Sequence, residues 1–296
     1  MDAVSLTEVT QRFGDVTALD HVSVSFGERR ITGLVGRNGA GKSTLLELVS
    51  GRARARLGSV TVHGKNPYED RAVLSQVCAV TESQPYPKSF RVSTVLTCAG
   101  LLHPQWDIST AHDLVDLFDL RRQQKVSQLS RGQRSALGVV VALASRAPVT
   151  VLDEPYVGLD AVARRQFYDR LLEEFVAHPR TVILSSHLID EVAHLLDHVV
   201  VIAHGRVVLD AATESVRDGI LELTGPSVLL DEYAARLTVL SRADLGGLTR
   251  AIVRGARADE AAARGLRVAH LPFQEAVLAL SSGPSRGSGV GTADSP

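Results

Sequence analysis

The chain has 296 residues, of which 45% are hydrophobic and 22% are charged, and its formal net charge is −1. This length allows one large domain or two smaller ones, and the near-zero charge argues against a globally basic nucleic-acid binder. The two cysteines, Cys78 and Cys98, cannot form a disulfide framework. We expect no signal peptide, and the longest apolar run, near residues 137–144, is too short to span a bilayer.

Residues 1 to about 35 alternate short apolar runs with turn signals, which predicts strands, and further strands are expected after the glycine-rich loop. The expected strands are Val4–Val9, Val22–Phe26, Ile31–Val35, Ser59–Val62 and Val77–Thr81. A helix is expected at Ser43–Ser50, directly after the glycine-rich residues 36–41. A largely helical block, about residues 90–146, follows as a subdomain.

From Pro148 onward, apolar strands alternate with helices, which favours a parallel sheet covered by helices on both faces. The expected order is strand Val149–Leu152, helix Asp160–Ala177, strand Arg180–Ser185, helix Leu188–Leu195, and a hairpin formed by Val199–Ala203 and Arg206–Asp210. The predicted fold class is therefore α/β, with antiparallel strands at the N-terminus.

The sequence pattern changes near residue 222, where short apolar segments begin to alternate with Arg, Ala and Gly. We therefore divide the chain into residues 1–222, 223–281 and 282–296. The second part has enough apolar residues for a small α+β appendage, and the Gly/Ser/Pro-rich tail is predicted to be disordered. The appendage is expected to contain strands at Val228–Leu230, Leu237–Leu240, Ala251–Val253 and Val268–Leu271, with helical pieces at Ala258–Arg264 and Gln274–Leu280. We expect it to strengthen dimerisation or to tune turnover.

Residues 36–43 read G-R-N-G-A-G-K-S and match the phosphate-binding pattern G-x-x-x-x-G-K-[ST]. Its glycines let backbone N–H groups surround a phosphate chain, and Lys42 can reach the β- and γ-phosphates. The Ser43 hydroxyl is placed for Mg²⁺, and the helix that follows adds its positive end. The candidate nucleotide-binding residues in this segment are Gly36, Asn38, Gly39, Gly41, Lys42, Ser43 and Thr44.

A second motif is the apolar strand that ends in Asp153 and Glu154. Ligands meet a parallel sheet at the carboxyl ends of its strands. Asp153 could therefore hold Mg²⁺, and Glu154 could polarise a water for in-line attack on the γ-phosphate. A strand that ends in two acidic residues is weak evidence by itself, but the phosphate loop upstream strengthens it.

With both motifs present, residues 4–210 resemble the nucleotide-binding domain of ABC transporters, a P-loop ATPase. The segment Leu129–Gln133, L-S-R-G-Q, resembles the family's LSGGQ signature, with Arg at its third position. The resemblance implies that Ser130, Gly132 and Gln133 contact nucleotide, and that Asp160 lies in the D-loop. It also implies that His187 is the switch histidine, which holds the γ-phosphate and the attacking water.

Two further assignments leave an alternative open. Phe13 matches the aromatic residue that stacks on adenine in the family, but it could instead be a core residue. Glu82 falls at the Q-loop position, where it could coordinate Mg²⁺ or water, although Gln84 lies two residues further on.

The segment His103–Asp107 and residues 164–167 resemble elements of small ABC-2-type exporters, although Trp106 could simply be a packing residue. The resemblance implies an ATP- and Mg²⁺-dependent ATPase subunit that powers a separate membrane permease, with drugs or antimicrobial peptides as typical substrates. Such a subunit would lie at the cytoplasmic face of the membrane. A soluble ABC ATPase acting on ribosomes or DNA, and a regulatory protein without turnover, are the alternatives. We expect no direct nucleic-acid partner.

One chain would supply only half of a nucleotide site. In the family, two subunits close head to tail, so Ser130 and the amides near Gly132 would come from a second copy. ATP would then favour the closed dimer, and hydrolysis would remove the γ-phosphate that bridges the two halves.

Overall fold

The computed structural model describes residues 2–81 and 86–282, and two units, Met1–Asp210 and Ala211–Pro296, have separate cores. The predicted boundary at residue 222 was therefore too late. Strand β10 (Ile220–Pro226) pairs with β12 (Leu248–Arg254) and β13 (Arg267–His270), so it belongs to the second sheet. Helix α8 (Thr213–Asp218), which precedes β10, is also part of the second unit.

The first unit starts with an antiparallel sheet in the order β2-β1-β4. Strands β1 (Asp2–Phe13) and β2 (Val16–Gly27) are longer than predicted because their paired register continues to the turn at residues 14 and 15. Strand β4 (Leu57–Val62) pairs with the other edge of β1. Apolar side chains such as Val4, Leu6 and Val9 face the core of this sheet.

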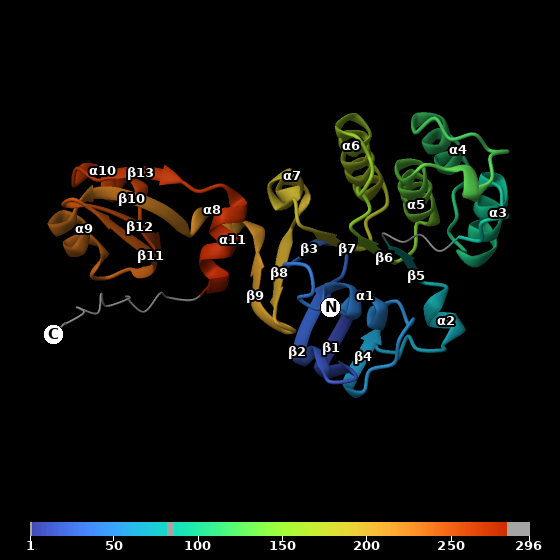
Figure 1. The fold of residues 1–296 in the computed structure, drawn as a ribbon, viewed down its shortest axis with the longest axis horizontal. Helices are drawn as coiled ribbons and strands as arrows, with labels where there is room; N and C mark the ends of the chain where they lie inside the picture. Colours follow the sequence, from blue (N-terminus) through green and yellow to red (C-terminus); the bar gives the residue numbers. More distant parts are fainter. Residues whose placement is uncertain (1, 82–85, 283–296) are drawn as a thin grey trace, which may run out of the picture. The chain divides into compact units, whose positions relative to one another are not determined.

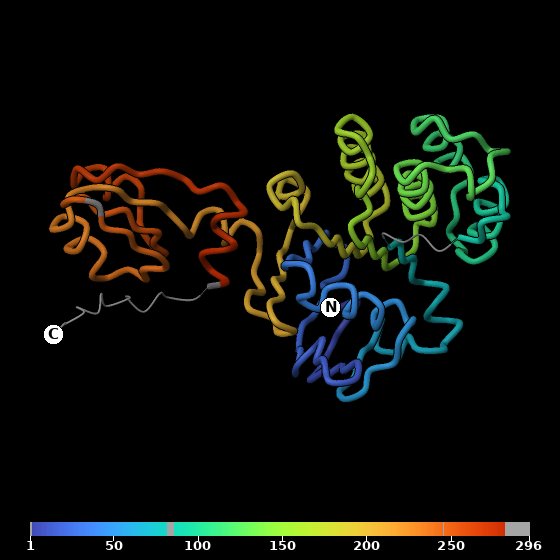
Figure 2. Tube along the Cα trace, in the orientation of Figure 1, coloured from blue at the N-terminus to red at the C-terminus, as the bar shows by residue number. Residues whose placement is uncertain are grey.

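A six-stranded sheet in the order β5-β6-β7-β3-β8-β9 forms the centre of the first unit (Figure 1). Its strands are β3 (Ile31–Val35), β5 (Val77–Val80), β6 (Val149–Asp153), β7 (Thr181–Ser186), β8 (His198–Ala203) and β9 (Arg206–Ala212). The pairs from β5 to β8 are parallel, as predicted. Strand β3 comes early in the chain but lies between the much later strands β7 and β8 (Figure 2). This order brings the residues after β3, β6 and β7 to one edge of the sheet.

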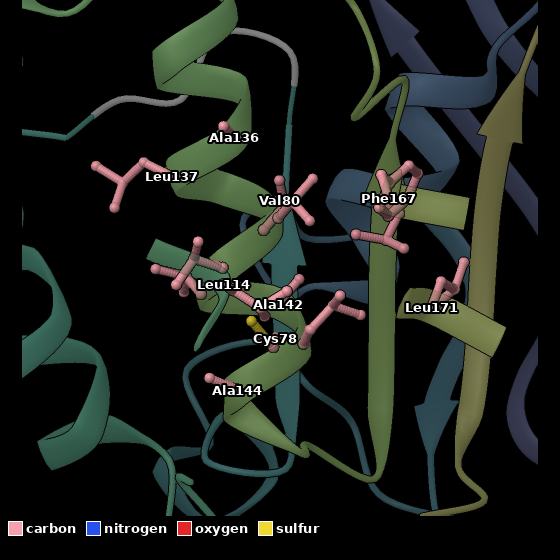
Figure 3. Packing of buried hydrophobic residues seen from close by; sticks show 14 of the residues in the cluster. Cys78, Val80, Leu114, Ala136, Leu137, Ala142, Ala144, Phe167 and Leu171 are labelled. Atoms are coloured by element: carbon pink, nitrogen blue, oxygen red, sulfur yellow. The ribbon is translucent and has the colours of Figure 1, made fainter. Parts of the chain in front are cut away.

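Helix α1 (Lys42–Val49) and the antiparallel sheet cover one face of the central sheet, and longer helices cover the other. These longer helices are α3 (Val92–Leu102), α4 (Ile108–Leu117), α5 (Arg131–Ser145) and α6 (Ala161–Ala177). Figure 3 shows Ala142 of α5 and Leu114 of α4 near Cys78 of β5, and Leu137 on the side of α5 turned away from Val80 of β5. The alternation of side chains along a strand gives each face its own core, since Val151 faces α1 and Leu152 faces the longer helices.

Short helical turns complete the first unit. They are α2 (Arg71–Leu74), the 3₁₀ turn Val126–Gln128, α7 (Ile189–Val192) and the 3₁₀ turn Ala193–Leu195. The burial of Cys78 in the core raises the pKa of its thiol to about 11, so this cysteine is an inert packing residue.

The segment His103–Asp107 has a clear structural role. Trp106 packs against the core, and the Cβ that a larger residue at Gly100 would carry lies 3.1 Å from its ring. Asp107 caps α4 by accepting a 2.7 Å hydrogen bond from the backbone N–H of Thr110. Hydrogen bonds from the Ser109 hydroxyl and from that N–H lower the pKa of Asp107 to about 2. These contacts support the interpretation of Trp106 as a packing residue.

The second unit is the predicted α+β appendage. Its sheet has the order β11-β12-β10-β13, and every pairing in it is antiparallel. Strand β11 is Thr238–Leu245, and the helices are α9 (Ser227–Ala234), α10 (Ala258–Ala263) and α11 (Phe273–Ser282), in addition to α8. From β10 to β13 the chain runs βαββαβ, the ferredoxin-like arrangement.

The predicted strand Val228–Leu230 was wrong, because this segment is the first half of α9. Leu230, Tyr233 and Ala234 are buried at the i, i+3 and i+4 positions of a helix, and they join Leu223 of β10 in the second core. Val228 and Leu229 are exposed on the other side of the helix. The short apolar run had the length of a strand, but its burial has the period of a helix.

Candidate functional site

The glycine-rich loop lies between β3 and α1, as the phosphate-binding pattern requires. Gly41 has a φ of 111°, and a Cβ there would lie 2.6 Å from the Ala18 carbonyl oxygen, so only glycine fits. Lys42 is buried, and its Nζ donates a 2.6 Å hydrogen bond to the Gly36 carbonyl oxygen and a longer one, 3.4 Å, to that of Arg37. The lysine is therefore held under the loop, with its charge at the loop's centre.

A cavity of about 410 Å³ opens over this loop. It brings together most of the predicted phosphate and metal residues with a stretch of β2, and its lining is Val16, Thr17, Ala18, Asn38, Gly39, Gly41, Lys42, Ser43, Thr44, Asp153 and Glu154. The sequence did not indicate the β2 wall, because residues 16–18 carry no recognisable motif. Gly36 lies outside this lining, and a Cβ there would lie 2.4 Å from the Ile202 carbonyl oxygen.

The two carboxylates at the end of β6 have different surroundings. Asp153 is buried, and its Oδ1 accepts a 2.6 Å hydrogen bond from the Ser185 hydroxyl of β7. The same hydroxyl oxygen accepts a 3.1 Å hydrogen bond from the backbone N–H of Glu154. Ser185 thus fixes the backbone of one acidic residue and the side chain of the other, a role that sequence reasoning missed.

Glu154 turns away from the strand, with a φ of 47° in the left-handed region that non-glycine residues rarely adopt. Its Oε1 lies 3.9 Å from Lys42 Nζ, and its Oε2 lies 3.2 Å from His187 Nδ1. The strained backbone places this carboxylate between the loop lysine and the histidine after β7.

Tyr156 is a further site residue that sequence reasoning missed. It is only 2% exposed, and its hydroxyl lies 3.1 Å from His187 Nδ1. The backbone N–H of His187 donates to the Tyr156 oxygen over 3.0 Å, and the Ser186 hydroxyl donates to it over 3.1 Å. Burial raises the pKa of Tyr156 above its ordinary value. An aromatic residue two positions after Glu154 was the only signal in the sequence, and it does not reveal these contacts.

The signature residues lie apart from the cavity lining. Ser130 caps helix α5 by accepting a 3.1 Å hydrogen bond from the Gln133 N–H, and the Gln133 side chain accepts one of 3.0 Å from the Ser130 N–H. A Cβ at Gly132 would lie 2.4 Å from the Gly158 carbonyl oxygen, so the signature packs closely on the segment before Asp160. Asp160 caps α6 through a 2.8 Å hydrogen bond from the Ala163 N–H.

Phe13 is 52% exposed at the end of β1, which rules out the alternative that it is a core residue. It does not line the cavity either, although the cavity wall begins at Val16 across the turn. Glu82 and Gln84, the two candidates for the Q-loop position, lie outside the described residues. Among the helices of residues 2–81 and 86–282, none combines the length and the apolar character that crossing a bilayer requires.

Residues 19–157 match the family model of the ABC transporter. The chain is 31% identical over 222 residues to the Nod factor export ATP-binding protein I of Sinorhizobium fredii, which covers 73% of this chain. It is 33% identical over 212 residues, 71% of its length, to the aliphatic sulfonates import ATP-binding protein SsuB 1 of Burkholderia cenocepacia. The chain spans 64% of the length of each of these two relatives.

Among solved structures, the chain is similar to the dimeric, post-hydrolysis state of the ATP-binding cassette MJ0796 bound to ADP and Pi. The TM-score is 0.62 at 20% identity, and the match covers 71% of this chain and 98% of that one. This likeness confirms the predicted fold class, including the central sheet and the helices on both of its faces.

Proposed function

We propose that this chain, which carries the nucleotide-binding domain of an ABC transporter, binds and hydrolyses ATP to power a separate membrane permease. The observation that carries the proposal is the cavity over the glycine-rich loop, because it gathers Lys42, Ser43, Asp153 and Glu154 at one sheet edge. A loop that binds phosphate, a lysine at its centre and a carboxylate beside the γ-phosphate position are the parts that phosphoryl transfer needs.

In this proposal, the backbone N–H groups of the loop and the Lys42 ammonium hold the phosphate chain, since Gly39, Gly41 and Lys42 line the cavity. The Ser43 hydroxyl and the Asp153 carboxylate line the same cavity, and oxygen ligands of this kind fit Mg²⁺. The metal would neutralise charge on the β- and γ-phosphates. Glu154 accepts a proton from the attacking water, and His187 holds that water and the γ-phosphate.

The second half of the site would come from another copy of this chain. Ser130 and the N-terminus of α5 do not line the cavity of their own chain, so they are available to contact the nucleotide of a partner. The positive end of a helix suits a γ-phosphate. In a head-to-tail dimer, each ATP would lie between the loop of one copy and the signature of the other.

The direction of transport is best supported as export. The similarity to a Nod factor export protein favours an exporter, whereas the similarity to a sulfonate import protein favours import. Our preference rests on the segments at His103 and Arg164 that resemble the ABC-2-type branch. The chain would then lie at the cytoplasmic face of the membrane through its contact with the permease, and the exported compound would be a drug, an antimicrobial peptide or a similar molecule.

The nucleotide assignment predicts that Lys42→Ala abolishes measurable ATP binding, because the phosphate chain loses its buried positive charge. The matched control is Lys65→Ala, which removes a lysine from an exposed position in the same unit. Isothermal titration with ATP and Mg²⁺ measures both variants. ATP binding by Lys42→Ala with wild-type affinity would remove the basis of the proposal.

The permease assignment predicts that the chain co-purifies from membranes with a multi-span membrane protein. Affinity purification of the tagged chain in mild detergent, followed by mass spectrometry, identifies the partner. Recovery of ribosomal proteins or DNA in place of a membrane protein would favour the soluble alternative.

A further inference from the structure

The hydrogen-bond network around Tyr156 determines where the proton of its hydroxyl lies. The oxygen of Tyr156 receives two hydrogens, one from the His187 backbone N–H and one from the Ser186 hydroxyl. A phenol oxygen with both acceptor positions filled has one hydrogen left to donate. The acceptor that the described contacts place within reach of this hydrogen is His187 Nδ1, at 3.1 Å.

The opposite arrangement leaves a buried group unsatisfied. If Tyr156 donated to Ser186 instead, the Ser186 hydrogen would need another acceptor. Ser186 is 1% exposed, and the described contacts give its hydroxyl only the Tyr156 oxygen as an acceptor and the Leu188 N–H as a donor. A buried donor without an acceptor is destabilising, because it has lost its hydrogen bonds to water. The network is complete only when Ser186 donates to Tyr156 and Tyr156 donates to His187.

We propose that Tyr156 is a positioning residue that fixes His187 in the neutral tautomer with its proton on Nε2. An Nδ1 atom that accepts the tyrosine hydrogen cannot carry a hydrogen of its own. His187 is 51% exposed, so its Nε2–H is free to serve as the donor to a bound γ-phosphate. This inference rests on the proposed ATPase function, and it concerns the same site.

The arrangement also has a consequence for Glu154. Its Oε2 lies 3.2 Å from His187 Nδ1, close enough for a hydrogen bond if Nδ1 carried a hydrogen. In that case the histidine would occupy the carboxylate oxygen that a water must reach. With Tyr156 donating to Nδ1, the carboxylate receives no hydrogen from the ring and stays available as a base. The burial of Tyr156 keeps its hydroxyl protonated, so the donor is always present.

The test compares Tyr156→Phe with Tyr168→Phe. Tyr168 is also buried, at 5% exposure, and its hydroxyl has no hydrogen-bond partner within the described residues. Both substitutions therefore remove one buried hydroxyl, but only the first breaks a contact with His187. Two-bond ¹⁵N–¹H spectra of histidine-labelled protein distinguish the two tautomers, and the signals lost in His187→Gln assign the ring.

In the wild-type chain and in Tyr168→Phe, we expect His187 to show a protonated Nε2 and an unprotonated Nδ1. In Tyr156→Phe, the proton should move to Nδ1, where it can reach Glu154. We expect kcat for ATP hydrolysis to fall about 10–100-fold, the range for partners that orient a working histidine. A variant that merely lost packing would not exchange one tautomer for the other.

A protonated Nδ1 in the wild-type chain would overturn the inference, and this measurement needs no ATP and no variant other than His187→Gln for the assignment. It therefore fails or succeeds independently of the proposed ATPase activity. An unchanged tautomer in Tyr156→Phe, or a changed tautomer with wild-type kcat, would also overturn it. If Tyr156→Phe does not fold, Ser186→Ala serves as the second variant. It removes the donor to Tyr156 and the acceptor of the Leu188 N–H, but it leaves the Tyr156 hydroxyl beside His187 Nδ1, so the Nε2–H tautomer must persist.

Discussion

Glu154→Gln is expected to bind ATP like the wild-type chain and to hydrolyse it ~10²–10⁴-fold more slowly. The amide keeps the size of the side chain but cannot accept the proton of the attacking water. The carboxylate lies at the end of β6, and its Oε1 is 3.9 Å from Lys42 Nζ. Loss of one negative charge at this position leaves the lysine more available to the phosphates, so binding should not weaken. An ATP-bound dimer should accumulate, because the γ-phosphate stays in place.

The control for this prediction is Glu173→Gln on helix α6, which removes an exposed carboxylate that pairs with Arg170. Its effect on hydrolysis should be negligible, since exposed ion pairs contribute at most about 1 kcal/mol to stability and this one is outside the cavity lining. Single-turnover hydrolysis and size-exclusion chromatography with ATP measure both variants. Wild-type turnover by Glu154→Gln would show that another group accepts the proton.

The parts of the site that depend on local chain geometry could be predicted from the sequence. Gly41, Lys42 and Ser43 are consecutive, and a loop between a buried strand and a helix has few ways to fold. The same holds for Asp153 and Glu154, because a parallel strand brings its last residues to the ligand edge. These assignments needed no knowledge of distant contacts.

Contacts between distant segments could not be predicted in the same way. The hydroxyl of Tyr156 meets His187, 31 residues later, only because β6 and β7 are neighbours in the sheet. The boundary at residue 222 was wrong for a related reason, because β10 is assigned by its partners β12 and β13, which come later in the chain. The apolar run at residues 228–230 fitted a strand or a helix, and only its burial against β10 distinguishes the two.

The composite site predicts that two inactive variants restore activity when they are mixed. Ser130→Arg places a bulky cation at the N-terminus of α5, where it replaces the cap and blocks the approach of a partner's phosphates. This variant should bind ATP through its own Lys42 but should neither dimerise around it nor hydrolyse it. Lys42→Ala should neither bind ATP nor hydrolyse it, because its loop cannot hold the nucleotide.

A mixed dimer of the two variants has one site in which the loop and the signature are both intact. The Ser130→Arg chain supplies Lys42 to this site, and the Lys42→Ala chain supplies Ser130. If equal amounts of the two chains pair at random, half of the dimers are mixed, and each mixed dimer has one intact site out of two. If the sites act independently, activity should therefore reach about a quarter of the wild-type value. Steady-state ATPase assays over a range of mixing ratios, with each variant alone as the control, measure this recovery. Full hydrolysis by Ser130→Arg alone would contradict a site shared between two chains, because one chain would then need no signature from its partner.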